Sequence, residues 1–210
     1  MRVLTANVGS SSVKLRLLDR QDNDLWEAEL AAAEGDIDEQ AAVSALADAP
    51  AFDAVAHRFV HGGARLRETT LVSDQVVAEL REAQALAPLH TAAALSLLDG
   101  LRSAFPAIPQ VACLDTAFHR HLPQAAAVYP VPWEWTERLG MRRYGFHGLS
   151  HDYASRRGAE LLGRPREELR LVSCHLGAGA SLAAVKGGVS VDTTMGLTPN
   201  EGLMMASRSG

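Results

Sequence analysis

Two turns in the sequence, one rich in serine and one rich in glycine, can offer backbone N–H groups to an anion. Residues 7–14 are Asn-Val-Gly-Ser-Ser-Ser-Val-Lys, and residues 175–181 are His-Leu-Gly-Ala-Gly-Ala-Ser. Successive N–H groups in such turns favour a phosphate or a carboxylate, and Lys14 adds a positive charge. The first turn lacks the GxxxxGK[ST] pattern of the P-loop. A serine-rich hairpin turn is therefore the structural alternative.

An arginine beside paired glycines is another candidate for anion binding. Residues 57–63 are His-Arg-Phe-Val-His-Gly-Gly, and the Arg58 guanidinium can hold a carboxylate through two parallel hydrogen bonds. His57 and His61 are four residues apart on a predicted strand, which separates them by about 13 Å. Because this spacing is too large for one ion, we do not expect metal ligation there.

Two further segments combine charged and polar side chains. Asp115 follows a predicted strand, where open sheets place functional groups, although an Asp there can also cap a turn. Residues 142–151 contain two Arg, two His, a Tyr and a Phe, which suits neither a core nor a plain surface. His147 can donate to a developing negative charge at neutral pH. The segment 142–151 therefore indicates function more than structure.

The elements that must position these residues predict an α/β fold. Alternating or short apolar runs predict strands, and Ala- and Leu-rich stretches predict helices. The first half follows the order βββαβαβ, in which strands 54–60 and 69–72 together take one β position and helices 73–80 and 90–101 together take one α position. Its predicted strands cover residues 2–8, 13–18, 25–30, 54–60, 69–72 and 109–114, and its helices cover 36–49 (capped by Asp36 or Asp38), 73–80 and 90–101.

The composition of the chain changes after residue 120. Three prolines and two tryptophans interrupt the segment from Pro123 to Trp135. A helix is expected near residues 151–162, and strands near 169–174, 181–185 and 189–191. We therefore predict one domain over residues 1–119 and the start of a second over residues 120–210.

Composition excludes several classes of protein. The 210 residues are 47% apolar and 21% charged, with a net charge of −5, so no global field attracts nucleic acid or an anionic membrane. Without a signal peptide or an apolar run of about 18 residues, we expect a cytoplasmic protein. Cys113 and Cys174 lie in apolar runs and are expected to be buried thiols. The sequence lacks HExxH, and no two histidines are expected one turn apart in a convincing helix, which disfavours a metal-dependent hydrolase.

Taken in order, these segments resemble the acetate kinase family. The resemblance implies an actin-like ATPase (ribonuclease H-like) fold, with a βββαβαβα domain, the first part of a second similar domain, and a nucleotide between them. It also implies reversible phosphoryl transfer between ATP and acetate, giving ADP and acetyl phosphate, with Mg²⁺. The matching stretches are NVGSSSVK, HRFVHGG, LAPLH, DTAFHRHLP, RRYGFHG with SH two residues on, HLGAGAS, DTTMGLTP, EGLMM and SRSG.

The resemblance assigns roles residue by residue. Arg58 and Arg208 would hold the carboxylate and the moving phosphoryl group, and His147 would donate to its equatorial oxygens. Asp115 would orient the carboxylate or the waters of the metal, and Asn7 would lie near Mg²⁺. The pocket for the substrate methyl would be lined by Val60, Leu89, Phe146 and Pro199, and the phosphates of ATP would lie near Ser10, Ser12, Lys14, His175, Gly177 and Gly179.

Some positions depart from the family pattern. Ala178 replaces the Asn of the usual HLGNG turn, so phosphate binding there must rely on backbone N–H groups. Leu149 and Asn200 also differ from the usual residues. The bulk of Val60 predicts acetate over propionate, although one methylene is worth only about 1–3 kcal/mol.

The family motifs continue beyond residue 210. We therefore expect a fragment with little or no activity alone. The partners would be small molecules, with a homodimer implied by the resemblance. The alternatives are a non-catalytic module that binds a small anion or a partner chain, and a propionate or butyrate kinase.

Overall fold

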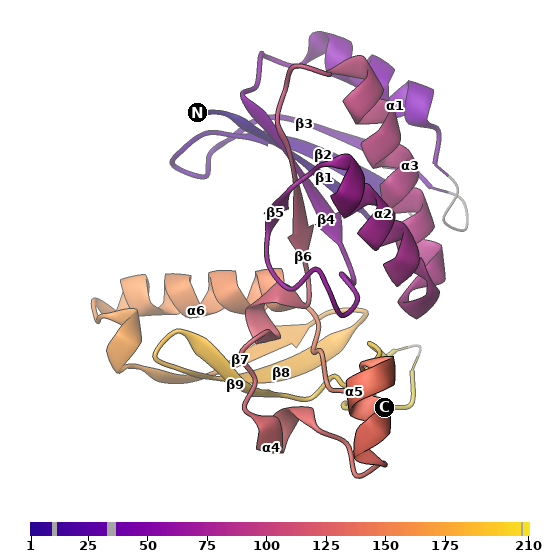
Figure 1. The fold of residues 1–210 in the computed structure, drawn as a ribbon. Coiled ribbons are helices and arrows are strands. Elements are labelled where there is room, and N and C mark those ends of the chain that lie inside the picture. The colour runs from indigo at the N-terminus through magenta and orange to yellow at the C-terminus, as the bar shows by residue number, and fades with distance from the viewer. Residues whose placement is uncertain (10–11, 33–36, 207) are drawn as a thin grey trace. The chain divides into compact units, whose positions relative to one another are not determined.

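The computed structural model describes residues 1–9, 12–32, 37–206 and 208–210, with Leu89 and His90 described by their backbone alone. The chain forms two compact units, Met1–Leu114 and Asp115–Gly210 (Figure 1). The units divide after Leu114, whereas the sequence analysis predicts a boundary after residue 119. Of the two caps proposed for the first helix, Asp36 lies outside the described residues.

Unit 1 is built on a six-stranded mixed sheet with the order β3-β2-β1-β4-β6-β5. Antiparallel pairing joins β1 to β2 and β2 to β3, whereas β4 and β6 run parallel to β1 and β5 is antiparallel to β6. The predicted strands of this half are confirmed, and their bounds are β1 Val3–Val8, β2 Ser12–Leu18, β3 Asp24–Ala31, β4 Ala54–Phe59, β5 Thr70–Leu71 and β6 Gln110–Leu114.

Strand alternation gives this sheet two different faces. Leu4, Leu15 and Phe59 have 0% exposure and lie on the face that α1 (Glu39–Ala45), α2 (Asp74–Ala83) and α3 (Pro88–Ala104) cover (Figure 1). Residues of opposite parity, among them Asn7 and Arg58, therefore point to the other face. The helices cover the apolar face because its burial is the main favourable term in folding.

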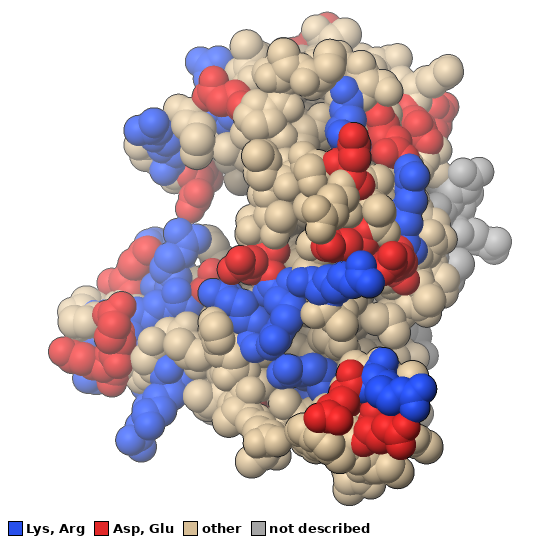
Figure 2. All heavy atoms as spheres, viewed as in Figure 1, with Lys and Arg blue, Asp and Glu red and all other residues tan. Residues whose placement is uncertain are grey.

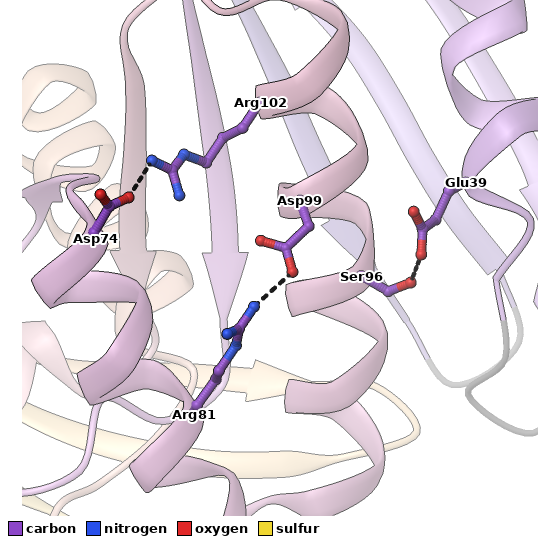
Figure 3. Close-up of polar contacts among 6 residues, drawn as sticks. All are labelled: Glu39, Asp74, Arg81, Ser96, Asp99 and Arg102. Atoms are coloured by element: carbon purple, nitrogen blue, oxygen red, sulfur yellow. Dashed lines mark hydrogen bonds and ion pairs between the residues drawn. The ribbon is translucent and has the colours of Figure 1, made fainter.

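Polar contacts fix the helices of unit 1 to one another. Asp38 Oδ1 accepts from Ala41 N at 2.8 Å and caps α1, which confirms Asp38 as a predicted cap. Between helices, Arg81 pairs with Asp99 and Arg102 with Asp74, both at 2.9 Å, while Ser96 bonds Glu39 (Figure 3). Basic and acidic side chains consequently alternate over α2 and α3 on the face in view in Figure 2.

Unit 2 contains an antiparallel sheet with the order β7-β8-β9. The long helix α6 and the turn η3 pack against this sheet (Figure 1). Its strands are β7 Arg170–Leu176, β8 Ala180–Lys186 and β9 Val189–Thr193, and its α-helices are α4 Gln124–Ala127, α5 Trp133–Leu139 and α6 Gly148–Leu162. Among the described residues of both units, the 3₁₀ turns are η1 Leu46–Asp48, η2 Gln84–Leu86, η3 Ala117–His119 and η4 Arg166–Glu168.

The proline-rich segment holds two helices that the sequence analysis did not predict. Pro123 and Pro132 stand at the N-caps of α4 and α5, where the missing N–H costs nothing because no intrahelical acceptor exists for it. These prolines therefore start helices and do not interrupt them. No helix in the described part of the chain has the length and apolar composition needed to cross a membrane.

One face of the β7–β8 pair is apolar and exposed. Val172 and Leu176 are 69% and 75% exposed, and Cys174 between them is exposed as well. The prediction of a buried Cys174 is wrong because alternation turns Ser173 and His175 toward α6 and Cys174 away from it. Cys113 is half-buried, and both residues are free thiols.

Candidate functional site

Two predicted residues meet on the helix-free face of unit 1. Arg58 Nη1 donates to Asn7 Oδ1 at 3.0 Å, near the carboxyl ends of β4 and β1. The amide oxygen of Asn7 has a second lone pair, and the guanidinium has five N–H donors. The pair can therefore present further donors and an acceptor to a ligand.

In the neighbouring hairpin, Ser12 and Lys14 both contact the carboxylate of Glu29. Lys14 stands opposite Asn7 in the register of β1 and β2, and its Nζ lies 3.5 Å from Glu29 Oε1. A hydrogen bond from Ser12, followed by the charge of Lys14, lowers the pKa of Glu29. Ser10, predicted to lie near phosphate, is outside the described residues.

The histidines next to Arg58 serve the core and turn of unit 1. His57 Nε2 donates to Gln110 Oε1 at 2.7 Å, and burial lowers the pKa of His57 to about 4. His61 Nδ1 accepts from Gly63 N at 2.8 Å. A Cβ at Gly62 would lie 2.2 Å from Leu66 O, so only glycine fits this turn beyond Arg58.

A tight turn holds His147 at the start of α6. Gly148 N donates to Asp115 O at 2.8 Å, and a Cβ at Gly148 would lie 2.2 Å from that oxygen. His147 has a φ of 55° and a ψ of 24°, a left-handed conformation that costs roughly 1–2 kcal/mol in a non-glycine residue. His119 Nε2 donates to Phe146 O at 3.1 Å and so supports the strained peptide.

Three predicted residues of unit 2 gather beside Gly179. A Cβ at Gly179 would lie 3.0 Å from Arg208 Nη2 and 3.3 Å from His147 Nε2. The His147 ring stacks on His175 with centroids 4.0 Å apart, and His175 Nδ1 bonds Ser150 Oγ at 2.8 Å. Arg208 Nη1 also donates to Pro199 O at 2.7 Å. The spot left open by Gly179 thus has a cation and an imidazole nitrogen at its edge.

Buried serines connect the histidines behind this spot. Ser181 Oγ lies 2.9 Å from His147 Nδ1 and 2.8 Å from His151 Nε2. His151 Nδ1 lies 2.9 Å from Ser173 Oγ. Burial lowers the pKa of His151 to about 3, so the ring is neutral at physiological pH.

The segment that leads to Arg208 is anchored through its main chain. Arg143 Nη1 donates to the carbonyl oxygens of Thr193, Thr194 and Met195 at 3.1–3.2 Å. Tyr129 Oη donates to Glu201 at 2.7 Å. Burial and that carboxylate raise the pKa of Tyr129 to about 12. These contacts fix the backbone at residues 193–195 and hold the side chain of Glu201.

Comparison with known proteins places this geometry in a family. The profile of the Acetokinase family matches residues 31–210. The chain belongs to the Acetokinase family. The acetate kinase of Synechococcus sp. (strain JA-2-3B'a(2-13)) is 56% identical over 167 residues, 80% of this chain and 41% of that protein. The acetate kinase of Caldanaerobacter subterraneus subsp. tengcongensis is 41% identical and covers 100% of this chain and 61% of that protein.

Solved structures agree with the family assignment. Porphyromonas gingivalis acetate kinase has a TM-score of 0.86 at 35% identity, and a Francisella tularensis propionate kinase has 0.88 at 33%. Each comparison covers 100% of this chain and 61% of the other. The actin-like α/β fold expected from the sequence is confirmed. The chain spans at most about 60% of the length of these Acetokinase relatives.

The four residues predicted to line the pocket of this Acetokinase member are divided between the units. Val60 of unit 1 is half-buried, and the side chain of Leu89 lies outside the described residues. In unit 2, Phe146 is 1% exposed and Pro199 is half-buried. Asp115 is buried at 2% exposure.

The sequence analysis did not include His119, His151, Ser173 and Ser181 in the candidate site, although hydrogen bonds connect them to Phe146 and His147 directly or through one another. The available signal was the four-residue spacing of His147 and His151, because His151 N donates to His147 O at 2.9 Å across the first turn of α6. The prediction that no two histidines lie one helical turn apart is therefore wrong. Among the described residues, no three His, Cys, Asp or Glu side chains gather where they could hold a metal ion.

Proposed function

We propose that this chain supplies the carboxylate-binding part of an acetate kinase, which transfers a phosphoryl group reversibly between ATP and acetate. The observation that carries the proposal is the meeting of Arg208 and His147 at Gly179, in a member of the Acetokinase family. In-line phosphoryl transfer needs positioned donors around three charged oxygens more than covalent help. A guanidinium and an imidazole N–H beside a residue without a side chain meet that need.

Each residue of the proposed site has one task. The Arg208 guanidinium and His147 Nε2 donate to the equatorial oxygens of the phosphoryl group as its charge is redistributed. Arg58 holds the acetate carboxylate, and Asn7 Oδ1 keeps the guanidinium in place through its 3.0 Å hydrogen bond. Asp115 orients the acceptor or the waters around the metal.

The nucleotide is held by backbone groups of the glycine-rich turn at residues 175–181. Gly177 N donates to Gly179 O at 3.0 Å and closes this turn. The N–H groups of Ala178 and Gly179 therefore take the phosphate, and His175 lies beside them. In the turn at residues 7–14, Ser12 and Lys14 would release Glu29 and bind phosphate in its place. Ser10 would also lie near that phosphate.

Mg²⁺ is the proposed metal, and the donor set fits a weakly anchored ion. Mg²⁺ prefers oxygen ligands and keeps several of its waters beside substrate phosphates. Asn7 Oδ1 retains a second lone pair after accepting from Arg58, and Asp115 would orient waters of the ion. The ion neutralises phosphate charge when bound.

The acid is proposed to be acetate. Half-buried Val60 would crowd a longer chain. Propionate is the second candidate because a propionate kinase is among the similar structures. The ratio of kcat/KM for the two acids decides: a propionate value equal to or above that of acetate would refute the acetate assignment. We further propose a cytoplasmic homodimer acting on small molecules only.

The assay of this function is acetyl phosphate formation from ATP and acetate, trapped as the hydroxamate. It is run on the 210-residue chain, expected to show little turnover, and, where the coding sequence extends further, on the longer product. In the active form, Arg208→Ala should lower kcat by about 10³-fold. Arg138→Ala is the matched control, because Arg138 makes an exposed pair with Glu134.

Calorimetry separates the catalytic proposal from a non-catalytic module. Acetate and ATP are titrated separately into the longer product. Binding of acetate or phosphate with neither ATP binding nor turnover would overturn the kinase proposal in favour of an anion-binding module.

A further inference from the structure

Three hydrogen bonds join four side chains of unit 2 into one line, which we name the Ser–His relay: Ser173, His151, Ser181 and His147. The joined atoms are 2.8–2.9 Å apart. His151 and Ser181 have 0% exposure and Ser173 has 8%. We propose that the relay fixes the ring proton of His147 on Nε2, so that the ring presents an N–H and not a lone pair beside Gly179. This inference rests on the proposed function, because the N–H has a use only if a phosphoryl group binds beside Gly179. The position of the ring proton can be measured whether or not that function holds.

The relay permits only two directions of donation. A neutral imidazole carries one N–H and one lone pair, and burial keeps His151 neutral by lowering its pKa to about 3. Ser181 has one hydroxyl hydrogen and two ring nitrogens as neighbours. Its hydroxyl therefore donates to one ring and accepts from the other, and this choice sets the proton position in both histidines.

The far end of the relay selects the direction. Ser173 Oγ has His151 as its one hydrogen-bond partner within the part of the chain that the structure describes. If His151 donated from Nδ1, the hydroxyl hydrogen of Ser173 would be buried without an acceptor, an arrangement that proteins avoid. With the opposite direction, the hydroxyl hydrogens of Ser173 and Ser181 and the ring hydrogen of His151 each have an acceptor within the line.

The selected direction ends at the reacting groups. Ser173 donates to His151 Nδ1, His151 Nε2 donates to Ser181, and Ser181 donates to His147 Nδ1. The remaining ring hydrogen of His147 is then on Nε2, 3.3 Å from the position of a Cβ at Gly179, with Arg208 Nη2 3.0 Å from the same position. A donor there stabilises a negative oxygen, whereas a lone pair would repel it. Ser181, His151 and Ser173 are thus positioning residues.

The ring nitrogens of His147 and His151 can be observed directly by NMR in the 210-residue chain labelled with ¹⁵N-histidine. The spectra are recorded without substrate at pH 8, where an unperturbed imidazole is neutral. We expect both rings to carry the proton on Nε2. A proton on Nδ1 of either ring would overturn the proposal, and this outcome requires no variant.

Removing the link tests whether the relay sets the tautomer. Ser181→Ala should lower the ratio of Nε2–H to Nδ1–H in His147 by about tenfold, because the bias passed along the line is lost. Ser181→Thr keeps the hydroxyl and should restore the ratio. Ser150→Ala is the matched control: it removes a serine bond to the stacked His175 but not to the relay. An unchanged ratio in a folded Ser181→Ala chain would overturn the proposal.

Kinetics in the longer, active product separate this inference from the proposed function. Ser181→Ala should lower kcat while leaving the KM for acetate unchanged, since Ser181 does not touch substrate. If the tautomers follow the expectation but no acetyl phosphate forms in the wild type, the proposed function fails and the relay stands. If acetyl phosphate forms but the wild-type His147 carries its proton on Nδ1, the relay fails and the proposed function stands.

Discussion

The two units bury different chemistry beneath their sheets. In unit 1 the helices cover an apolar face with Leu4, Leu15 and Phe59 at 0% exposure, and the proposed site residues Asn7 and Arg58 lie on the other face. In unit 2 the covered face carries hydroxyl and imidazole groups, and the other face is apolar and exposed. A buried polar layer must satisfy every donor, so it holds rings in defined orientations. Unit 1 gains stability from apolar burial, whereas unit 2 uses burial to order its site.

Acidification should distinguish the units most strongly. Burial lowers the pKa of His119 to about 4 and of His151 to about 3 in unit 2, and of His57 to about 4 in unit 1. A histidine in the unfolded chain has a pKa of about 6.5. Between that pH and the lowered pKa of each buried ring, the unfolded state binds more protons than the folded state, so the free energy of unfolding decreases as pH decreases. From pH 7 to 5 we expect a loss of roughly 4 kcal/mol in unit 2 and 2 kcal/mol in unit 1.

Hydrogen exchange measured for each unit at several pH values checks this difference. His121→Gln, at an exposed histidine, is the control for removing a histidine that is not buried. Equal slopes in the two units would contradict the prediction.

The turn at the start of α6 should tolerate no side chain. Gly148→Ala puts a Cβ 2.2 Å from Asp115 O, a backbone atom that cannot yield cheaply, so we expect a loss of roughly 3 kcal/mol. Gly158 in the same helix has nothing within 4 Å of its Cβ position. Gly158→Ala should therefore stabilise the chain by about 0.5–1 kcal/mol. Denaturant unfolding should show a lower free energy of unfolding for Gly148→Ala and a higher one for Gly158→Ala. A similar change in both variants would refute the steric account.

The arginines of the two units should respond differently to the same substitution. Arg143→Lys loses a guanidinium bonded to three carbonyl oxygens, which one ammonium cannot replace. We expect a loss of roughly 2 kcal/mol. Arg102→Lys in unit 1 keeps a charge near Asp74, whose side chain is 97% exposed, and should cost under about 0.5 kcal/mol. Thermal unfolding compares the pair, and a larger loss for Arg102→Lys would contradict the assignment.

A smaller effect than that of Arg143→Lys is expected for the cap of α1 in unit 1. Asp38→Ala removes the side-chain cap of α1 and should cost about 1 kcal/mol. Asp48→Ala, at the end of η1, is the control because no cap depends on it. Hydrogen exchange should increase in α1 without any change in unit 2, and an equal increase in both units would show that the cap effect is not local.

The sequence predicts strands better than it predicts the partners of buried polar groups. Alternation places the strands of both sheets, since a period of two follows directly from the geometry of a strand. The same alternation predicts an exposed Cys174 if the neighbouring Ser173 is taken as buried. The bonds of Ser181 to His147 and His151 span 34 and 30 residues, and no local pattern encodes such pairing. The helices after Pro123 and Pro132 were missed because proline at an N-cap has the opposite meaning from proline inside a helix.

The exposed Cys174 gives this chain a chemical handle. Burial raises the pKa of the Cys113 thiol, so at neutral pH a maleimide reagent should modify Cys174 first. The attached probe would lie beside Val172 and Leu176, on the side of β7 away from Ser173 and His175. Its fluorescence would then report when something covers that apolar face, while leaving the histidine chemistry behind the strand undisturbed.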